Sequence, residues 1–234
     1  MKKIFVLIGN FGSGKTELAL NIAFEAAKRG KTELIDLDIV NTYFRLTERK
    51  KQIESAEIRL VSPNYACTNV ETLSLPAEVA SAFDLDWDTV VFDVGGDPAG
   101  ATALGRYHDD FAALSPEQLE VLCVVNVRRP MAGTPEKIAS LCSDMERSAR
   151  LKVTGFVNNT NLSYATTEAE LRDGYETLRA ASELTGIPVA YTSGKREILE
   201  KFTAEGHDER YVGKLLPIDI YMHRDWETFT HLGQ

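Results

Sequence analysis

Eight residues near the start of the chain have the types and spacing of a phosphate-binding loop. They are Gly9, Asn10, Phe11, Gly12, Ser13, Gly14, Lys15 and Thr16. They fill every fixed position of the pattern G-x-x-x-x-G-K-[ST], between an apolar run at 4–8 and a helical pattern that starts at Glu17. In this pattern backbone N–H groups and a helix N-terminus hold the phosphates, the lysine reaches the β- and γ-phosphates, and the threonine hydroxyl ligates Mg²⁺. We therefore predict that the chain binds a nucleoside triphosphate with Mg²⁺.

Carboxylates that end two other apolar runs are candidates to complete this site. Asp93 ends the run 89–93 and precedes Gly95 and Gly96. A carboxylate there predicts a second Mg²⁺ ligand, direct or through water, and Gly96 lets a backbone N–H approach the γ-phosphate. Asp36 and Asp38 end the run 33–37 and share one side of an extended chain. One of these two could hold Mg²⁺ through water and the other could orient the attacking water. The alternatives are a capping role for Asp93 and two solvated acids at 36 and 38.

Apolar runs that alternate with helical patterns predict the elements that bring these residues together. Strands are expected near 3–8, 33–37, 58–61, 89–93, 121–127, 153–157 and 187–191. Helices are expected near 15–29, 46–54, 76–83, 97–113, 134–150 and 167–184. Pro188 places the strand at 187–191 at an edge, because proline cannot donate to a ladder. The order predicts an α/β fold with a doubly wound, mainly parallel sheet flanked by helices, in a single domain over 1–234.

Composition narrows the partners and the location. The net charge of −9 over 234 residues disfavours nucleic acid or an anionic membrane as a partner. The longest apolar runs are strand-length, and the first one breaks at Gly9, so neither a transmembrane helix nor a signal peptide is expected. Cys67, Cys123 and Cys142 are an odd number without C-x-x-C spacing, which is typical of reduced thiols. These features predict a cytoplasmic protein.

Three segments resemble the MinD/ParA family of P-loop ATPases. The segment 36–41 is similar to its switch I, 91–96 to its Walker B and switch II, and 157–159 to a strand end whose Asn lies by the base. The resemblance covers about the first 190 residues in order of elements. It implies Mg²⁺-ATP as ligand, a homodimer, Asp38 as the water-orienting residue and Asp36 nearer the metal. It also implies that Asn158 or Asn159 contacts adenine.

The chain departs from that family at two places. Asn10 stands where the family has a lysine that reaches across an ATP-bridged dimer, and the segment 225–229 lacks the basic amphipathic character of the MinD membrane helix. An arginine could replace the lysine by stabilising charge on the transferring phosphoryl group. The candidates are Arg45, Arg106 and the pair Arg128-Arg129, and for each the alternative is a solvated or ion-paired surface side chain.

These features favour a slow ATPase that acts as a nucleotide-dependent switch on a protein client. One alternative is a small-molecule kinase or synthetase, for which the segment 62–75 could supply a lid. Another is a nucleotide-gated scaffold or chaperone with little turnover. GTP also remains open, although the segment 158–161 has neither the lysine nor the aspartate of the guanine motif N-K-x-D.

Overall fold

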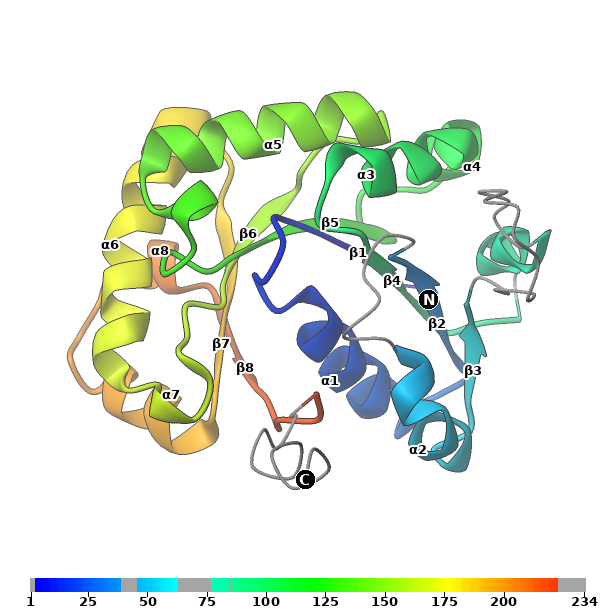
Figure 1. Ribbon diagram of the computed structural model, residues 1–234, viewed down its shortest axis with the longest axis horizontal. Helices are drawn as coiled ribbons and strands as arrows, with labels where there is room; N and C mark the ends of the chain where they lie inside the picture. Colours follow the sequence, from blue (N-terminus) through cyan, green and yellow to red (C-terminus); the bar gives the residue numbers. More distant parts are fainter. Residues whose placement is uncertain (1–2, 39–45, 63–76, 85, 223–234) are drawn as a thin grey trace, which may run out of the picture.

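The strands form one sheet in which every pair is parallel. The computed structural model describes residues 3–38, 46–62, 77–84 and 86–222 (Figure 1). The strands are β1 (Lys3–Ile8), β2 (Thr32–Leu37), β3 (Ile58–Val61), β4 (Thr89–Val94), β5 (Leu119–Val125), β6 (Gly155–Asn158), β7 (Val189–Gly194) and β8 (Lys214–Pro217). Their order across the sheet is β3-β2-β4-β1-β5-β6-β7-β8. This confirms the α/β, doubly wound class, with β1 and the loop after it at the centre.

Helices cover both faces of the sheet. The α-helices are α1 (Lys15–Ala27), α2 (Lys50–Ser55), α3 (Pro98–Leu104), α4 (His108–Ala112), α5 (Pro135–Ala149), α6 (Glu168–Thr185), α7 (Arg196–Thr203) and α8 (Glu209–Val212). The 3₁₀ helices are η1 (Leu46–Arg49), η2 (Ala77–Phe83), η3 (Gly105–Tyr107), η4 (Pro130–Ala132) and η5 (Ser163–Ala165). In Figure 1, α1 and α2 lie on one face of the sheet, and α3, α4 and α5 lie on the other.

Capping residues set the starts of three helices. Thr167 and Glu170 form the capping box that begins α6. Thr134 and Asp97 cap α5 and α3, each with proline at the next position, and the Asp97 carboxylate accepts a hydrogen bond from Gly100 N at 2.7 Å. Asp97 is therefore explained by its structural role. The helix expected over 97–113 is broken into α3, η3 and α4, and the helix expected at 76–83 is the 3₁₀ helix η2.

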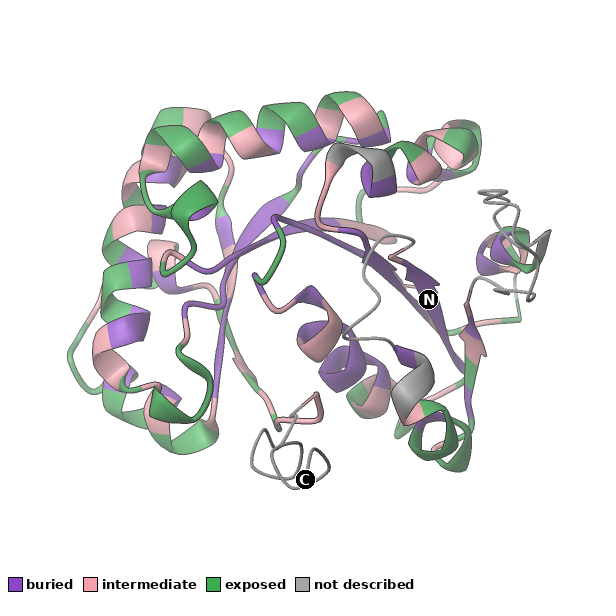
Figure 2. Cartoon of the chain, viewed as in Figure 1, coloured by how far each residue is buried: buried purple, intermediate pink, exposed green. Residues whose placement is uncertain are grey.

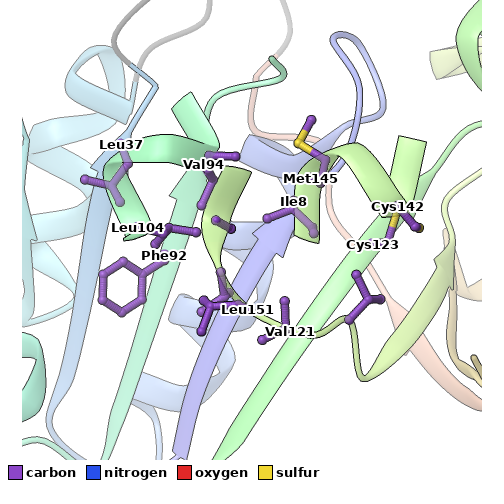
Figure 3. Packing of buried hydrophobic residues seen from close by; sticks show 14 of the residues in the cluster. Ile8, Leu37, Phe92, Val94, Leu104, Val121, Cys123, Cys142, Met145 and Leu151 are labelled. Carbon is purple, nitrogen blue, oxygen red and sulfur yellow. The ribbon is translucent and has the colours of Figure 1, made fainter. Parts of the chain in front are cut away.

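The core lies on both faces of the central strands (Figure 2). All six residues of β2 are buried, which fits a strand with neighbours on both sides and helices on both faces. Figure 3 shows the face covered by α5, where Met145 and Cys142 point toward the strand residues Ile8 and Cys123. Cys123 and Cys142 are free, buried thiols, and Cys67 lies outside the described residues.

The edge position predicted for the strand at 187–191 is wrong. β7 begins at Val189, one residue after Pro188, so the missing N–H of that proline falls before the strand. The Pro188 carbonyl still accepts a hydrogen bond from Phe156 N at 2.8 Å. The ladder continues past β7 to β8, which pairs with it from Tyr191 to Gly194. The edges of the described sheet are β3 and β8.

No helix among the described residues is both long enough and apolar enough to span a bilayer. The cytoplasmic location and the single domain over 1–234 stay predictions.

Candidate functional site

The loop between β1 and α1 has the backbone that its glycines predict. Gly9, Gly12 and Gly14 have φ of 146°, 74° and 91°, and Gly14 takes the left-handed conformation at the N-cap of α1. A Cβ at Gly14 would also collide with Nδ2 of Asn159. Only glycine satisfies both constraints, so any other residue at position 14 would be strained and would collide with Asn159.

A buried cation at the start of α1 and a buried anion near the end of β4 interact electrostatically. Lys15 is 6% exposed and Asp93 is 1% exposed. Lys15 Nζ donates a hydrogen bond to the Asn10 carbonyl at 3.1 Å, and the Thr16 hydroxyl is hydrogen-bonded to Asp93. The other Asp93 oxygen, Oδ1, has no hydrogen-bond partner within the described part of the chain. Such a buried acceptor is costly unless a cation or donor meets it.

Burial dominates the ionisation of both groups. It raises the pKa of Asp93 to about 6, while the Lys15 charge and the Thr16 hydrogen bond lower that pKa part of the way. Burial likewise lowers the pKa of Lys15, and the charges of Asp93 and then Asp38 oppose that shift. Each group therefore stabilises the ionised form of the other.

The strand register places the predicted carboxylates on one face of the sheet. Asp36 of β2 is directly opposite Asp93 of β4, and β4 in turn pairs with β1 at Leu7. Register partners in a parallel pair share a face, and this is the face that α1 covers. Asp38 follows two residues after Asp36, and its backbone N–H donates to Asp36 Oδ1 at 3.0 Å. Asp36 is buried, whereas Asp38 lines a cleft beside the loop.

The glycine pair after β4 packs against the phosphate-binding loop. A Cβ on Gly96 would lie 2.7 Å from the backbone N of Phe11, and one on Gly95 would lie 3.4 Å from Asp38 Oδ1. The first distance is too short for any side chain. Gly96 therefore permits a close approach between this segment and the loop.

The cleft has a volume of about 630 Å³ and runs along the carboxyl ends of the strands. Its lining includes Lys15, Thr16 and Asp38, and also Lys195, Ile198 and Ile218. Ligand pockets in α/β sheets lie at this edge, and volumes of roughly 300–1,000 Å³ accommodate small molecules. The loop and Asp38 thus line one cleft, and Asp93 interacts with Lys15 and Thr16 of the same loop.

The two asparagines after β6 have different positions. Asn159 lines the cleft, where its Nδ2 donates to the Ser13 carbonyl at 2.7 Å and its Oδ1 accepts from the Ser193 hydroxyl at 2.8 Å. The Asn159 side chain therefore links the loop to β7 by hydrogen bonds. Asn158 is buried and donates to the Leu171 carbonyl at 2.9 Å. It does not line the cleft, so the structure does not support the predicted contact of Asn158 with adenine.

The arginine candidates also differ in their positions relative to the cleft. Arg129 lines the cleft, and its Nε donates to the Gly12 carbonyl at 3.0 Å. Arg128 points elsewhere and pairs with Glu170 at 3.1 Å and Asp173 at 2.6 Å. Arg106 is exposed and is not part of the cleft, while Arg45 lies outside the described residues.

Sequence reasoning missed one side of the cleft. Ser193, Gly194 and Lys195 line it at the end of β7, and the rule that sites lie at the carboxyl ends of strands would have found them. Ile218, Ile220 and Met222 also line it, but no motif in the sequence distinguishes them.

The residues present fit Mg²⁺. Among the described residues, no group of three or more His, Cys, Asp or Glu could hold a metal ion. The fit rests instead on the Thr16 hydroxyl and the unpartnered Oδ1 of Asp93, which are oxygen donors of the kind that Mg²⁺ prefers, with phosphate oxygens as further ligands.

Solved structures of FtsY share this fold. FtsY from Thermotoga maritima matches with a TM-score of 0.54 and 19% identity over 82% of this chain and 62% of that one. Chloroplast FtsY from Physcomitrella patens gives 0.55 and 16% over 82% and 58%. The signal recognition particle receptor FtsY from Elizabethkingia anophelis, in complex with GDP, gives 0.51 and 18% over 82% and 57%. The chain spans about three fifths of the length of these FtsY structures.

The chain has the P-loop NTPase fold. A scan against protein-family models and a search of the curated proteins found no match. The FtsY structures confirm the predicted fold, and the specific resemblance to MinD/ParA stays a prediction.

Because Asn159 links the loop to β7, we expect its removal to weaken binding of the phosphates rather than binding of the base. Asn159→Ala removes the hydrogen bonds to Ser13 and Ser193, so the loop loses its support. We expect ATP and inorganic tripolyphosphate to lose affinity by similar factors of about 30-fold, as two hydrogen bonds of about 1 kcal/mol each predict. Titration calorimetry of both ligands checks this. A loss confined to ATP would instead identify Asn159 as a base contact.

The raised pKa of Asp93 predicts a pH-dependent stability of the nucleotide-free protein. Between its ordinary value of 3.8 and about 6, folded Asp93 keeps a proton that the unfolded chain has released. The stability that this group contributes is therefore present below about pH 4 and lost as the pH rises through 6. The shift corresponds to on the order of 2–3 kcal/mol. Urea unfolding of wild type and Asp93→Asn at pH 4 and 7 checks this: wild type should lose that much relative to the variant, and a constant difference would contradict it.

Proposed function

We propose that the chain is a Mg²⁺-dependent ATP-binding protein that hydrolyses ATP slowly and acts as a nucleotide-dependent switch on a protein client. The observation that carries the proposal is the buried Asp93 carboxylate, which has one oxygen unpartnered in the described structure and lies beside Lys15 and Thr16, two residues that line a nucleotide-sized cleft. A buried charge pair of this kind is costly in a purely structural role. A Mg²⁺-triphosphate would meet both charges at once.

Each residue of the phosphate end has a distinct task in this proposal. Lys15 exchanges its hydrogen bond to the Asn10 carbonyl for phosphate oxygens. Thr16 and Asp93 would hold Mg²⁺, which would supply positive charge beside the phosphates. Asp38 lines the cleft and orients the attacking water, as the resemblance implies, while Asp36 fixes the backbone of Asp38 through its N–H.

The far end of the cleft favours adenine over guanine. The guanine edge presents two adjacent donors, which a carboxylate accepts best. Among the described lining residues the acids are Glu17 and Asp38, and Glu17 already accepts the backbone N–H groups of Tyr221 and Met222. GTP remains the alternative, because one FtsY structure of the same fold was solved with GDP.

The segment after β4 is the element that would switch. Gly96 lies against Phe11 of the loop and Gly95 against Asp38, so a change at the γ-phosphate would reach this segment directly. Phe11 and Met131 line the same cleft and are exposed, which offers an apolar rim to a client or to a second copy of the chain. Arg129 is the candidate to replace the family's lysine in a homodimer. Neither nucleic acid nor a membrane is proposed as a partner.

The role of Asp38 predicts a turnover defect without a binding defect. Asp38→Ala should bind Mg²⁺-ATP about normally and lose about 10²–10⁴-fold in phosphate release, the range for positioned acid–base groups. Asp110→Ala, an exposed acid on α4, is the matched control and should keep wild-type turnover. Wild-type turnover in Asp38→Ala would remove this role. A wild-type protein that binds ATP but never releases phosphate, even with an added acceptor or partner, would favour the scaffold alternative. Phosphate transfer to an added small molecule would favour the kinase.

The role of Asp93 predicts a metal-dependent loss. Asp93→Asn keeps the shape of the side chain but removes the charge that faces the cation. ATP affinity should fall by about tenfold or more with Mg²⁺, whereas affinity measured in EDTA should change little. Calorimetry in the two buffers provides the comparison, and equal losses in both would return Asp93 to a structural role.

A further inference from the structure

A segment far from the loop in sequence is fixed along α1. Asp219 N donates to Asn21 Oδ1 at 2.8 Å, and Asn21 Nδ2 donates back to the Asp219 carbonyl at 2.9 Å. One turn earlier on α1, the two carboxylate oxygens of Glu17 accept the backbone N–H groups of Tyr221 and Met222, the latter at 3.0 Å. We call the segment Ile218–Met222 the strap.

Two further contacts fix the position of the strap. The rings of Tyr221 and Phe24 lie 4.9 Å apart, which extends the contact by another turn of α1. At its start, Ile218 N donates to the Gly194 carbonyl at 3.0 Å, so the strap is also tied to the end of β7. The strap therefore joins the helix that begins in the phosphate-binding loop to the strand end on the other side of the cleft.

The helix side chains that hold the strap are specific for it. Burial raises the pKa of Glu17, and the N–H groups of Tyr221 and Met222 offset part of that rise. The two backbone amides donate to the Glu17 carboxylate the hydrogen bonds that water would donate to a surface glutamate. Glu25, on the same helix, shows the ordinary case, because it is exposed and pairs with Lys28 and Arg29.

Every second side chain of the strap lines the cleft. Ile218, Ile220 and Met222 line it, together with Ile198 from α7. Lys15, Thr16 and Asp38, which the proposed function assigns to the triphosphate, are instead polar or charged. A ligand that is anionic at one end and flat and apolar at the other matches this division, and a nucleotide is such a ligand.

We infer that the strap is the wall of the cleft that contacts the nucleotide base, and that Glu17 and Asn21 are positioning residues that hold it there. The inference rests on the proposed function, because it identifies the wall that the base would meet in the same site. Glu17 directly follows Thr16, so one short stretch of α1 holds both the phosphate end and the base wall. Base contact and strap order then reinforce each other, since a ligand that contacts the held strap stabilises it.

The test compares a ligand that has a base with one that lacks it. Glu17→Gln leaves one acceptor for two N–H donors and turns an NH₂ toward the second, while Asn21→Ala removes both hydrogen bonds to Asp219. In each variant, ATP affinity should fall by about tenfold. The affinity for inorganic tripolyphosphate should stay within about twofold of wild type, a change well under 1 kcal/mol. Glu25→Gln is the matched control and should change neither affinity.

Hydrogen exchange at Tyr221 and Met222 gives an independent readout that does not depend on the variants. ATP should slow exchange of these amides in the wild-type protein, and tripolyphosphate should slow it much less. Equal loss of both ligands in Glu17→Gln and Asn21→Ala, or no loss of either, would overturn the inference while leaving the nucleotide site in place. A wild-type protein that binds neither ATP nor tripolyphosphate would instead remove the proposed function itself.

Discussion

The buried charge pair of Lys15 and Asp93 is the constraint on which the rest of the site depends. Removing an ionised group from water costs several kcal/mol per ion. For two such groups, this cost must be offset by their mutual attraction, by hydrogen bonds or by a charged ligand. The pair exists because β1 and β4 are neighbours at the centre of the sheet and end at the same edge. The surroundings then follow from it. Gly14 allows α1 to begin at Lys15, whose Nζ then reaches the Asn10 carbonyl. Asn159, which directly follows β6, holds the loop through its hydrogen bond to the Ser13 carbonyl.

The fold explains why these elements converge but does not decide what they do. An all-parallel sheet directs every carboxyl end to one edge, so a cleft there draws on several strands. FtsY structures have the same fold at 16–19% identity, which is a statement about architecture. Function resides in the particular side chains at that edge. Here Lys15, Asp38 and several apolar side chains line one cleft, and Asp36 and Asp93 are buried in neighbouring strands.

The sequence was enough to predict the loop and the strand-end carboxylates beside it, but not the apolar part of the cleft lining. The loop and Asp93 were predictable because motif spacing and strand-end position are local signals, and the two-residue spacing of Asp36 and Asp38 does place both near the loop. The edge strand was missed because β8 is only four residues long and ends in Pro217, and a proline within an apolar run argues against a strand. Asn158 and Asn159 are adjacent and look equivalent in sequence, but successive strand residues point to opposite faces, and only pairing partners decide which one enters the cleft. The contact between Glu17 and the strap joins residues more than 200 positions apart, and no local pattern encodes such a contact.

The central claim is that Lys15 and its surroundings form a nucleoside triphosphate site. Titration calorimetry of ATP into the wild-type protein and into Lys15→Ala, with Mg²⁺ present, tests it most directly. Circular dichroism and thermal unfolding of both proteins establish that the variant is folded. We expect saturable binding by the wild type and none by a folded Lys15→Ala protein, because the ammonium that would reach the phosphates is gone. Unchanged ATP affinity in a folded Lys15→Ala protein would contradict it.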